Sequence, residues 1–211
     1  MIPYGTFTFF LIAFIVLIPV IILGFLGKRS YIYNGISTAI MIVIIFASDK
    51  HNLLGQKYLS AQLFCFIIYV IWQVALIMYY YQSRQKKNTF TKFVTIMVLS
   101  ILPLAIVKIL QSSWLGGHQI HFHESKLIEF VGFLGISYVT FKSVQLIMEI
   151  RDGSIKEIKV GKLIQFISFF PTISSGPIDR YKRFVKDDKK VLSGVEYREL
   201  VVKAIHMIML R

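Results

Sequence analysis

The sequence is poor in charged residues and in cysteine. Only 17% of its 211 residues are charged and 55% are hydrophobic, whereas about a quarter of the residues in a soluble domain are charged. The single cysteine, Cys65, lies in an apolar stretch and has no partner in the chain. An intramolecular disulfide is therefore excluded, and a zinc site built from cysteines is not expected. The composition is that of an integral membrane chain.

Acidic residues are also scarce. The chain has 11 Asp and Glu against 24 Lys and Arg, which gives a formal net charge of +13. In a soluble protein this balance would favour a nucleic-acid partner. Here the basic residues lie between apolar runs, so the bias indicates orientation in a membrane, and no nucleic-acid partner is expected.

Five apolar segments are long enough to cross a bilayer. Residues 1–27 hold no charged side chain, and at about 1.5 Å per residue they give a helix longer than the roughly 30 Å hydrocarbon core. Because this segment lacks the basic start and cleavage site of a signal peptide, we expect it to be retained. The expected spans are residues 1–27, 31–48, 59–81, 93–112 and 127–150. The sequence thus predicts an all-α, polytopic transmembrane protein.

The loops between these segments differ in basic residues. If the spans alternate, one side receives Lys28, Arg29, Arg84, Lys86, Lys87, Lys92, Arg151, Lys156, Lys159 and Lys162. The other side receives Lys50, Lys57 and Lys126. Because basic residues in short loops mark the cytoplasmic face, we expect the first set inside and the N-terminus outside.

Residues 163–178 are uncharged but interrupted. Pro171 and Pro177 enclose two serines and a glycine, so a broken or re-entrant element is expected in place of a continuous straight helix. Irregular backbone at membrane depth persists only where protein or a water-filled cavity satisfies its polar groups. This element is therefore expected to border a cavity.

The chain after this element is rich in charge. Residues 179–199 form a basic segment that we expect on the cytoplasmic side. Ser193 and Glu196 have the spacing of a capping box, which predicts a helix that continues with apolar residues towards Leu210. About ten apolar residues are too few to cross a bilayer. We therefore expect residues 1–211 to be the N-terminal portion of a single, longer membrane domain.

The fifth span has a polar face. Small and polar residues recur there every three or four positions and so share one side of a helix: Gly132, Gly135, Tyr138, Lys142, Gln145 and Glu149. An ionised group inside the bilayer is costly and points into the bundle or a wet cavity. The face therefore either lines a cavity or packs against another helix with its polar groups paired. Lys108, near the end of its span, is explained by snorkelling.

The histidines form no familiar site. His118, His121 and His123 share one outer loop, but their spacing matches no known zinc site, so a solvated loop is the simpler interpretation and no metal is expected. His206 is a general base only in the abstract, because a histidine without a visible nucleophile or orienting partner is usually structural. The sequence contains no glycine-rich phosphate loop, nucleophile elbow or paired-carboxylate motif.

Two motifs carry a resemblance to a known family. They are residues 135–141 (GISYVTF) and residues 169–181 (FFPTISSGPIDRY). The second motif is specific, because its Pro-Thr, Ser-Gly-Pro and Asp-Arg-Tyr combination rarely arises from apolar composition alone. On these residues the chain resembles the membrane-bound O-acyltransferase family. The whole chain, including the opening IPYG, is similar to the first half of the bacterial members that decorate lipoteichoic acid with D-alanine.

The resemblance implies an acyl transfer across the cell membrane of a Gram-positive bacterium. A D-alanyl thioester, carried on the phosphopantetheine arm of a cytosolic carrier protein, would pass to a hydroxyl of lipoteichoic acid outside. The family fold is a ring of helices around a narrow tunnel, in which a histidine acts as a base near the acceptor hydroxyl. That histidine is expected beyond Arg211, so no residue here is assigned a catalytic role. Other membrane proteins of D-alanylation and membrane lipids are implied partners, and no cofactor is expected to bind directly.

The resemblance and the polar face together give candidates for the tunnel or its cytoplasmic mouth: Tyr138, Lys142, Gln145, Ser175, Gly176, Pro177, Asp179 and Arg180. Proline and glycine would hold a broken backbone there, and Arg180 would pair locally or with an acidic partner. Two other classes of function remain open. Half of a transporter or flippase would predict an inverted repeat elsewhere in the protein. A non-catalytic scaffold would not need the broken segment or an intramembrane lysine.

Overall fold

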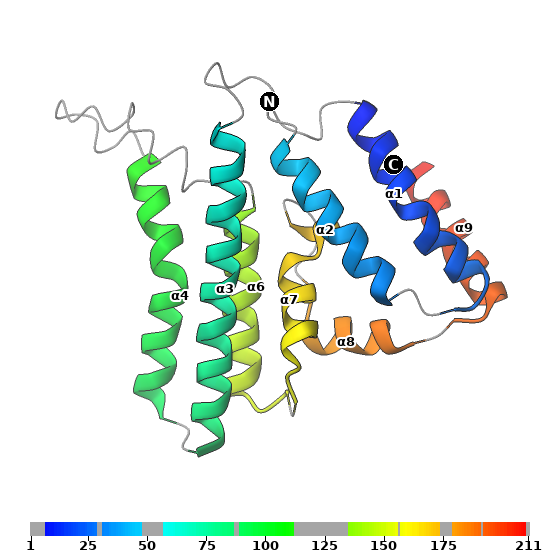
Figure 1. Cartoon of the computed structure of the whole chain (residues 1–211). Helices are drawn as coiled ribbons and strands as arrows, with labels where there is room; N and C mark the ends of the chain where they lie inside the picture. The colour runs from blue at the N-terminus through cyan, green and yellow to red at the C-terminus, as the bar shows by residue number, and fades with distance from the viewer. Residues whose placement is uncertain are drawn as a thin grey trace. The chain divides into compact units, whose positions relative to one another are not determined.

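The described part of the chain is helical. The computed structural model describes residues 7–28, 31–47, 57–86, 89–111, 135–155, 157–173, 179–190 and 192–209. These residues contain no strand (Figure 1), which confirms the predicted all-α class. The helices are α1 Phe7–Phe25, α2 Tyr31–Ala47, α3 Lys57–Lys86, α4 Phe90–Gln111, α6 Ile136–Arg151, α7 Val160–Ser168, the 3-10 helix η4 Phe170–Thr172, α8 Tyr181–Lys189 and α9 Gly194–Met209.

The helices belong to two compact units. The first unit combines Met1–His51 with Val185–Arg211 and contains α1, α2 and α9. The second unit, Asn52–Phe184, contains α3, α4, α6 and α7, and α8 runs from one unit into the other. A single membrane domain over the whole chain stays a prediction.

In the first unit, α1 packs against both α2 and α9. The Ser37 hydroxyl of α2 donates to the carbonyl of Val16, 3.2 Å away. The Tyr197 ring of α9 meets Phe25 edge-on, with centroids 5.2 Å apart, and lies so close to Gly24 that a Cβ there would overlap it. A glycine at this position therefore lets α1 and α9 approach each other, as small residues do between membrane helices.

The predicted capping box starts α9. The Ser193 backbone N–H and hydroxyl donate to Oε2 of Glu196 at 3.0 and 3.1 Å, and the Glu196 backbone N–H lies 3.3 Å from the Ser193 hydroxyl oxygen. These bonds satisfy donors that a helix N-terminus leaves free. The prediction of a helix beginning here is confirmed.

The apolar helices are compatible with a membrane protein. Among the described residues, two stretches, Gln62–Lys86 and Phe90–Ile109, are long and apolar enough to cross a bilayer, and Phe9–Phe25 and Ile32–Phe46 are shorter apolar helices. Residues 127–134 of the expected fifth span lie outside the described residues. The count of five spans therefore stays a prediction.

Helix α3 extends beyond the predicted third span, whose membrane boundary stays a prediction. The third span was expected to end at residue 81, before the basic residues, but α3 continues to Lys86. In this extension the Nε of Arg84 donates to the carbonyl of Arg151 at 3.1 Å. Basic residues near a helix C-terminus also suit the helix dipole, so the change in polarity does not end the helix.

A buried polar network joins the long helices of the second unit. The side-chain amide of Gln73 in α3 donates to the Tyr69 hydroxyl at 2.9 Å and to the Ser100 carbonyl at 3.0 Å. Its carbonyl oxygen accepts from the Ser100 hydroxyl at 2.8 Å. The Tyr69 hydroxyl lies 2.6 Å from that of Thr140 in α6. All four residues are buried, so α3, α4 and α6 are tied by satisfied polar groups inside an apolar bundle.

The predicted break is present as far as the structure describes it. Helix α7 ends at Ser168, Phe169 leaves the helical conformation with φ −55° and ψ 110°, and a 3-10 turn follows with Pro171 near its start. Proline suits the first positions of such a turn because it needs no amide donor there. Residues 174–178 lie outside the described residues.

Candidate functional site

A groove of about 510 Å³ runs along one side of α6 in the second unit. The α6 residues that line it recur every three or four positions, and a second wall comes from the start of α8. The lining residues are Phe141, Val144, Gln145, Met148, Glu149, Asp152, Ser154, Arg180 and Lys182. The groove therefore has an apolar wall and an end with charges of both signs.

An ion pair crosses the groove between Glu149 and Arg180. Arg180 Nε lies 4.0 Å from Glu149 Oε1. The same oxygen accepts from the Gln145 amide at 3.4 Å. The other oxygen, Oε2, is buried and has no hydrogen-bond partner among the described residues. A buried, half-satisfied carboxylate beside a groove is a site where a further donor would be stabilised.

Asp179 fixes the backbone from which Arg180 extends. Its Oδ1 accepts from the Arg180 backbone N–H at 2.8 Å and lies 3.7 Å from Nε of Arg183. The exposed Arg180 side chain is thus directed by a local turn that precedes α8. Sequence reasoning had expected a local or an acidic partner for Arg180, and the partner is Glu149, 31 positions earlier in the chain.

Lys142 lies on α6 but does not line the groove. Its side chain is buried, and its ammonium donates to the Phe166 carbonyl at 3.2 Å and to the Thr172 hydroxyl at 2.6 Å. The Ile167 carbonyl lies at 3.5 Å. These contacts run across the interface with α7, as the packing alternative for the polar face requires. Tyr138, half-buried on the same helix, does not belong to the groove lining either.

The candidates therefore separate into three groups. Gln145 and Arg180 both line the groove, and Asp179 accepts a hydrogen bond from the Arg180 backbone. Tyr138 and Lys142 lie elsewhere on α6. The remaining three, Ser175, Gly176 and Pro177, lie outside the described residues.

Sequence reasoning did not select all the groove residues. The polar residues Asp152, Ser154 and Lys182 were missed, as were the apolar residues Phe141, Val144 and Met148, whereas Glu149 was placed on the polar face without being a candidate. The signal for Asp152 was its spacing, because it follows Glu149 by three positions on the same face. No comparable pattern marks Lys182, which lines the groove because the start of α8 forms its second wall.

Tyr181 follows Arg180 and anchors the start of α8. It is buried, and its ring meets Phe166 edge-on with centroids 5.5 Å apart. Burial raises the pKa of the Tyr181 phenol, opposed by a hydrogen bond from the Lys159 backbone. The phenol therefore stays neutral at physiological pH and serves as a packing group.

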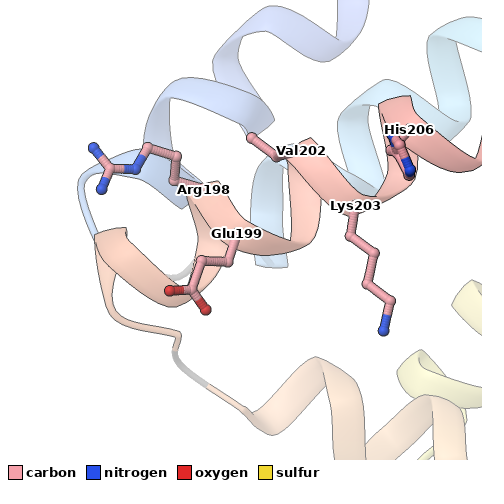
Figure 2. A pocket seen from close by; sticks show the side chains of 5 residues that line it. All are labelled: Arg198, Glu199, Val202, Lys203 and His206. Carbon is pink, nitrogen blue, oxygen red and sulfur yellow. The ribbon is translucent and has the colours of Figure 1, made fainter.

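A second, shallower groove lies along α9 and contains His206. It has a volume of about 310 Å³, and Figure 2 shows its five lining side chains rising from successive turns of the one helix: Arg198, Glu199, Val202, Lys203 and His206. His206 is exposed. No hydroxyl or thiol belongs to this lining, so among the described groove residues His206 has no hydroxyl or thiol to activate as a nucleophile. No group of three metal-ligating side chains occurs in the described part of the chain, and the three loop histidines lie outside it.

Known proteins resemble the chain over nearly its whole length. It is 46% identical over 209 residues to the teichoic acid D-alanyltransferase of Bacillus subtilis (strain 168). This alignment covers 99% of this chain and 49% of that protein. The enzymes of the same name from Lacticaseibacillus rhamnosus and Streptococcus thermophilus are 41% and 32% identical, again over 99% of this chain, and 47% and 45% of their own lengths are covered. The chain resembles part of a teichoic acid D-alanyltransferase.

The likeness to teichoic acid D-alanyltransferases is continuous rather than confined to short motifs. The alignments leave about 1% of the chain uncovered. The resemblance inferred from residues 135–141 and 169–181 is therefore confirmed at the level of these relatives. No family model matches the chain. The chain spans about half the length of the curated relatives it matches.

Proposed function

We propose that the chain is part of a membrane-bound O-acyltransferase that D-alanylates teichoic acid. The observation that supports this most is the 46% identity to a teichoic acid D-alanyltransferase over 99% of the chain. The two long apolar helices support a place in the cell membrane. The loop charges support an N-terminus on the outside.

The proposed reaction moves a D-alanyl group from sulfur to oxygen. A hydroxyl of lipoteichoic acid attacks the carbonyl of a D-alanyl thioester on the phosphopantetheine arm of a carrier protein. The C–O bond forms as the C–S bond breaks, a base takes the hydroxyl proton, and the thiolate leaves and is protonated. A histidine has a suitable pKa for that base. We place it in the part of the enzyme outside this chain, so this chain shapes the route to it.

We assign the α6 groove to the mouth through which the arm enters from the cytoplasm. Arg180 and Lys182 lie at one end of the groove and can bind a phosphate, for which the arginine fork is well suited. Phe141 and Met148 form an apolar wall along which the chain of the arm can lie. The carrier protein, lipoteichoic acid, surrounding lipids and other membrane proteins of D-alanylation are then its partners, in a Gram-positive cell membrane.

A chimera tests the function. In a Bacillus subtilis strain that lacks its D-alanyltransferase, this chain replaces the matching half of that enzyme, and the D-alanine ester content of lipoteichoic acid is measured. We expect restoration to near the wild-type level. A chimera that inserts in the membrane at normal abundance but transfers no D-alanine would contradict the proposal.

The chain by itself is the second arm of this test. We expect no transfer from loaded carrier protein to lipoteichoic acid in membranes that contain only residues 1–211, because the proposed base lies elsewhere. The chimera in the same membranes is the positive control. Sustained, carrier-dependent transfer by the chain alone would refute the placement of the base.

A further inference from the structure

The break after α7 leaves backbone groups in need of partners. The last carbonyls of a helix have no intrahelical donor. Those of Phe166 and Ile167 lie in the last turn of α7, where the chain leaves the helix at Phe169. In an apolar bundle an unsatisfied carbonyl costs free energy, so the break persists only if another element supplies donors.

Lys142 supplies these donors from α6. An ammonium group has three N–H bonds, and it has three acceptors here: the Phe166 and Ile167 carbonyls and the Thr172 hydroxyl. The first two precede the break and the third follows it. A positive charge at this end of α7 is also favoured by the helix dipole. The ammonium lies 5.6 Å from the centroid of the Phe166 ring, which adds a cation–π contact.

Gly135 holds the other side of the break. This residue precedes α6 with a φ of 94°, a conformation that favours glycine. A Cβ at Gly135 would lie 2.5 Å from the carbonyl oxygen of Ile173. The backbone after the turn therefore packs directly on the start of α6. Gly135 and Lys142 are about two helical turns apart along α6, so they contact the break at two separate points.

The break is coupled by packing to the start of α8. The Phe166 ring meets those of Tyr181 and Phe184 with centroids 5.5 and 5.4 Å away, and Phe169 meets Phe184 at 5.6 Å. A shift of the end of α7 would move these rings. It would therefore displace the turn from which Arg180 extends.

We propose that Lys142 and Gly135 form a two-point clamp that fixes the break after α7, and that Lys142 is a positioning residue for the Asp179–Arg180 turn. Lys142 acts on that turn through the backbone of α7 and the Phe166 ring. Its effect on transfer rests on the proposed function. Its effect on the break does not.

Hydrogen exchange tests the clamp in the full 211-residue chain in detergent. Lys142→Met keeps a long apolar stem and removes all three donors. We expect the amides of residues 166–173, except Pro171, which has no amide hydrogen, to exchange about tenfold faster or more, the change expected from losing one or two hydrogen bonds. Amides of α3 and α4 should keep their rates, whereas a general loss of stability would accelerate all of them.

Ser143→Ala is the matched control. Ser143 is the buried neighbour of Lys142, and its hydroxyl bonds within α6 to the Val139 carbonyl at 2.9 Å. Ser143→Ala should therefore leave amide exchange at the break unchanged. Gly135→Ala should accelerate exchange in the same segment by an independent route, and Thr172→Val, which removes one acceptor, should do so to a smaller extent. The Thr172 variant decides the matter if the Lys142 variant does not fold.

The outcomes separate the clamp from the proposed function. If Lys142→Met folds and the amides at the break exchange at the wild-type rate, the clamp is refuted. If that variant is unfolded, wild-type exchange rates in Thr172→Val refute it. Faster local exchange with a chimera that never transfers D-alanine supports the clamp and refutes the proposed function. Where the parent chimera is active, Lys142→Met should lower its transfer at matched abundance while Ser143→Ala should not. Unchanged transfer would refute the positioning role.

Discussion

Arg180 approaches Glu149 to 4.0 Å between Nε and Oε1, although their side chains are 79% and 15% exposed, respectively. The carboxylate belongs to α6, and the exposed guanidinium reaches it from the residue that precedes α8. Because the Arg180 guanidinium is exposed and screened by solvent, an ion pair at this distance contributes little to stability, roughly 0 to 1 kcal/mol. The pair is therefore better suited to place a cation in the groove than to hold the fold together.

Replacing Arg180 should therefore affect transfer more than folding. We expect Arg180→Ala in the chimera to insert at normal abundance and to lose D-alanine transfer. A thioester must be delivered in a fixed geometry, and a displacement of about 1 Å can cost about a hundredfold in rate. The D-alanine ester content of lipoteichoic acid, measured at matched abundance, reports the loss.

Two further variants identify the reason for any loss. Arg183→Ala removes a neighbouring exposed arginine that pairs with Asp179 and does not line the groove, so transfer should persist. Arg180→Lys keeps the charge but not the planar fork. Loss of D-alanine transfer in Arg180→Ala with full transfer in Arg180→Lys would indicate that the charge of Arg180 only anchors the membrane boundary. Wild-type transfer in Arg180→Ala would eliminate the role at the mouth.

The buried network around Gln73 predicts a stability effect. Gln73→Leu removes three hydrogen bonds and leaves the Ser100 hydroxyl without its acceptor in α3. Interhelical hydrogen bonds in membranes contribute modestly, so we expect a loss of about 1–2 kcal/mol in the free energy of unfolding. Denaturation of the purified chain in detergent measures it.

Gln82→Leu is the control for this prediction, because Gln82 lies on the same helix and is exposed. It should change stability by less than about 0.5 kcal/mol. A double-mutant cycle with Ser100→Ala should give a non-zero coupling, because the two side chains bond directly. Additive effects of Gln73→Leu and Ser100→Ala would show that this contact contributes nothing.

The apolar pattern predicted helix positions better than helix ends. Residues 31–48 were expected as a span, and α2 occupies Tyr31–Ala47. The third span was predicted to end near Tyr81, and α3 continues past this position to Lys86, with Arg84 donating to the Arg151 carbonyl. Polarity determines where a helix leaves lipid, whereas hydrogen bonding determines where it stops.

The sequence predicted individual residues of the site but not the contacts between them. Spacing put Lys142 and Glu149 on one polar face, but only the packing of α7 shows that the lysine meets backbone carbonyls there. Arg180 was selected from a motif without its partner. Gln73 was not predicted to matter, because an uncharged amide in an apolar segment gives no signal until its hydrogen-bond partners are known.

The capping box makes the start of α9 sensitive to acid. Hydrogen bonds from the Ser193 backbone and hydroxyl lower the pKa of the Glu196 carboxyl. A depressed carboxyl pKa stabilises the folded form above the unfolded value of about 4.3, and this stabilisation is lost as the pH falls through the folded value. We expect an NMR titration that follows the side-chain carboxyl carbon of Glu196 to show a midpoint pH below that of an unfolded peptide.

Ser193→Ala is the matched control for the titration. It removes the hydroxyl, so the Glu196 midpoint should move up towards the ordinary value. The first turn of α9 should lose about 1 kcal/mol, as is usual when a serine cap is replaced by alanine. An unchanged midpoint in this variant would mean that the hydroxyl does not hold the carboxylate.

The distribution of basic residues predicts which loops face the cytoplasm. Asn88 falls in the basic connection after α3, and Asn52 in the connection before it. Both lie outside the described residues, so topology has to be probed chemically. If the positive-inside preference sets the orientation, position 52 faces outward and position 88 faces the cytoplasm.

Single cysteines at Asn52 and Asn88, in a chain in which Cys65 is replaced by alanine, separate the two orientations. An impermeant thiol reagent applied to intact cells should label position 52 and spare position 88, because the reagent cannot cross the bilayer. Permeabilised cells provide the control, since both positions should then react. Labelling of position 88 but not position 52 on intact cells would reverse the orientation. The groove that contains Arg180 would then open to the outside, where no carrier-bound thioester can reach it.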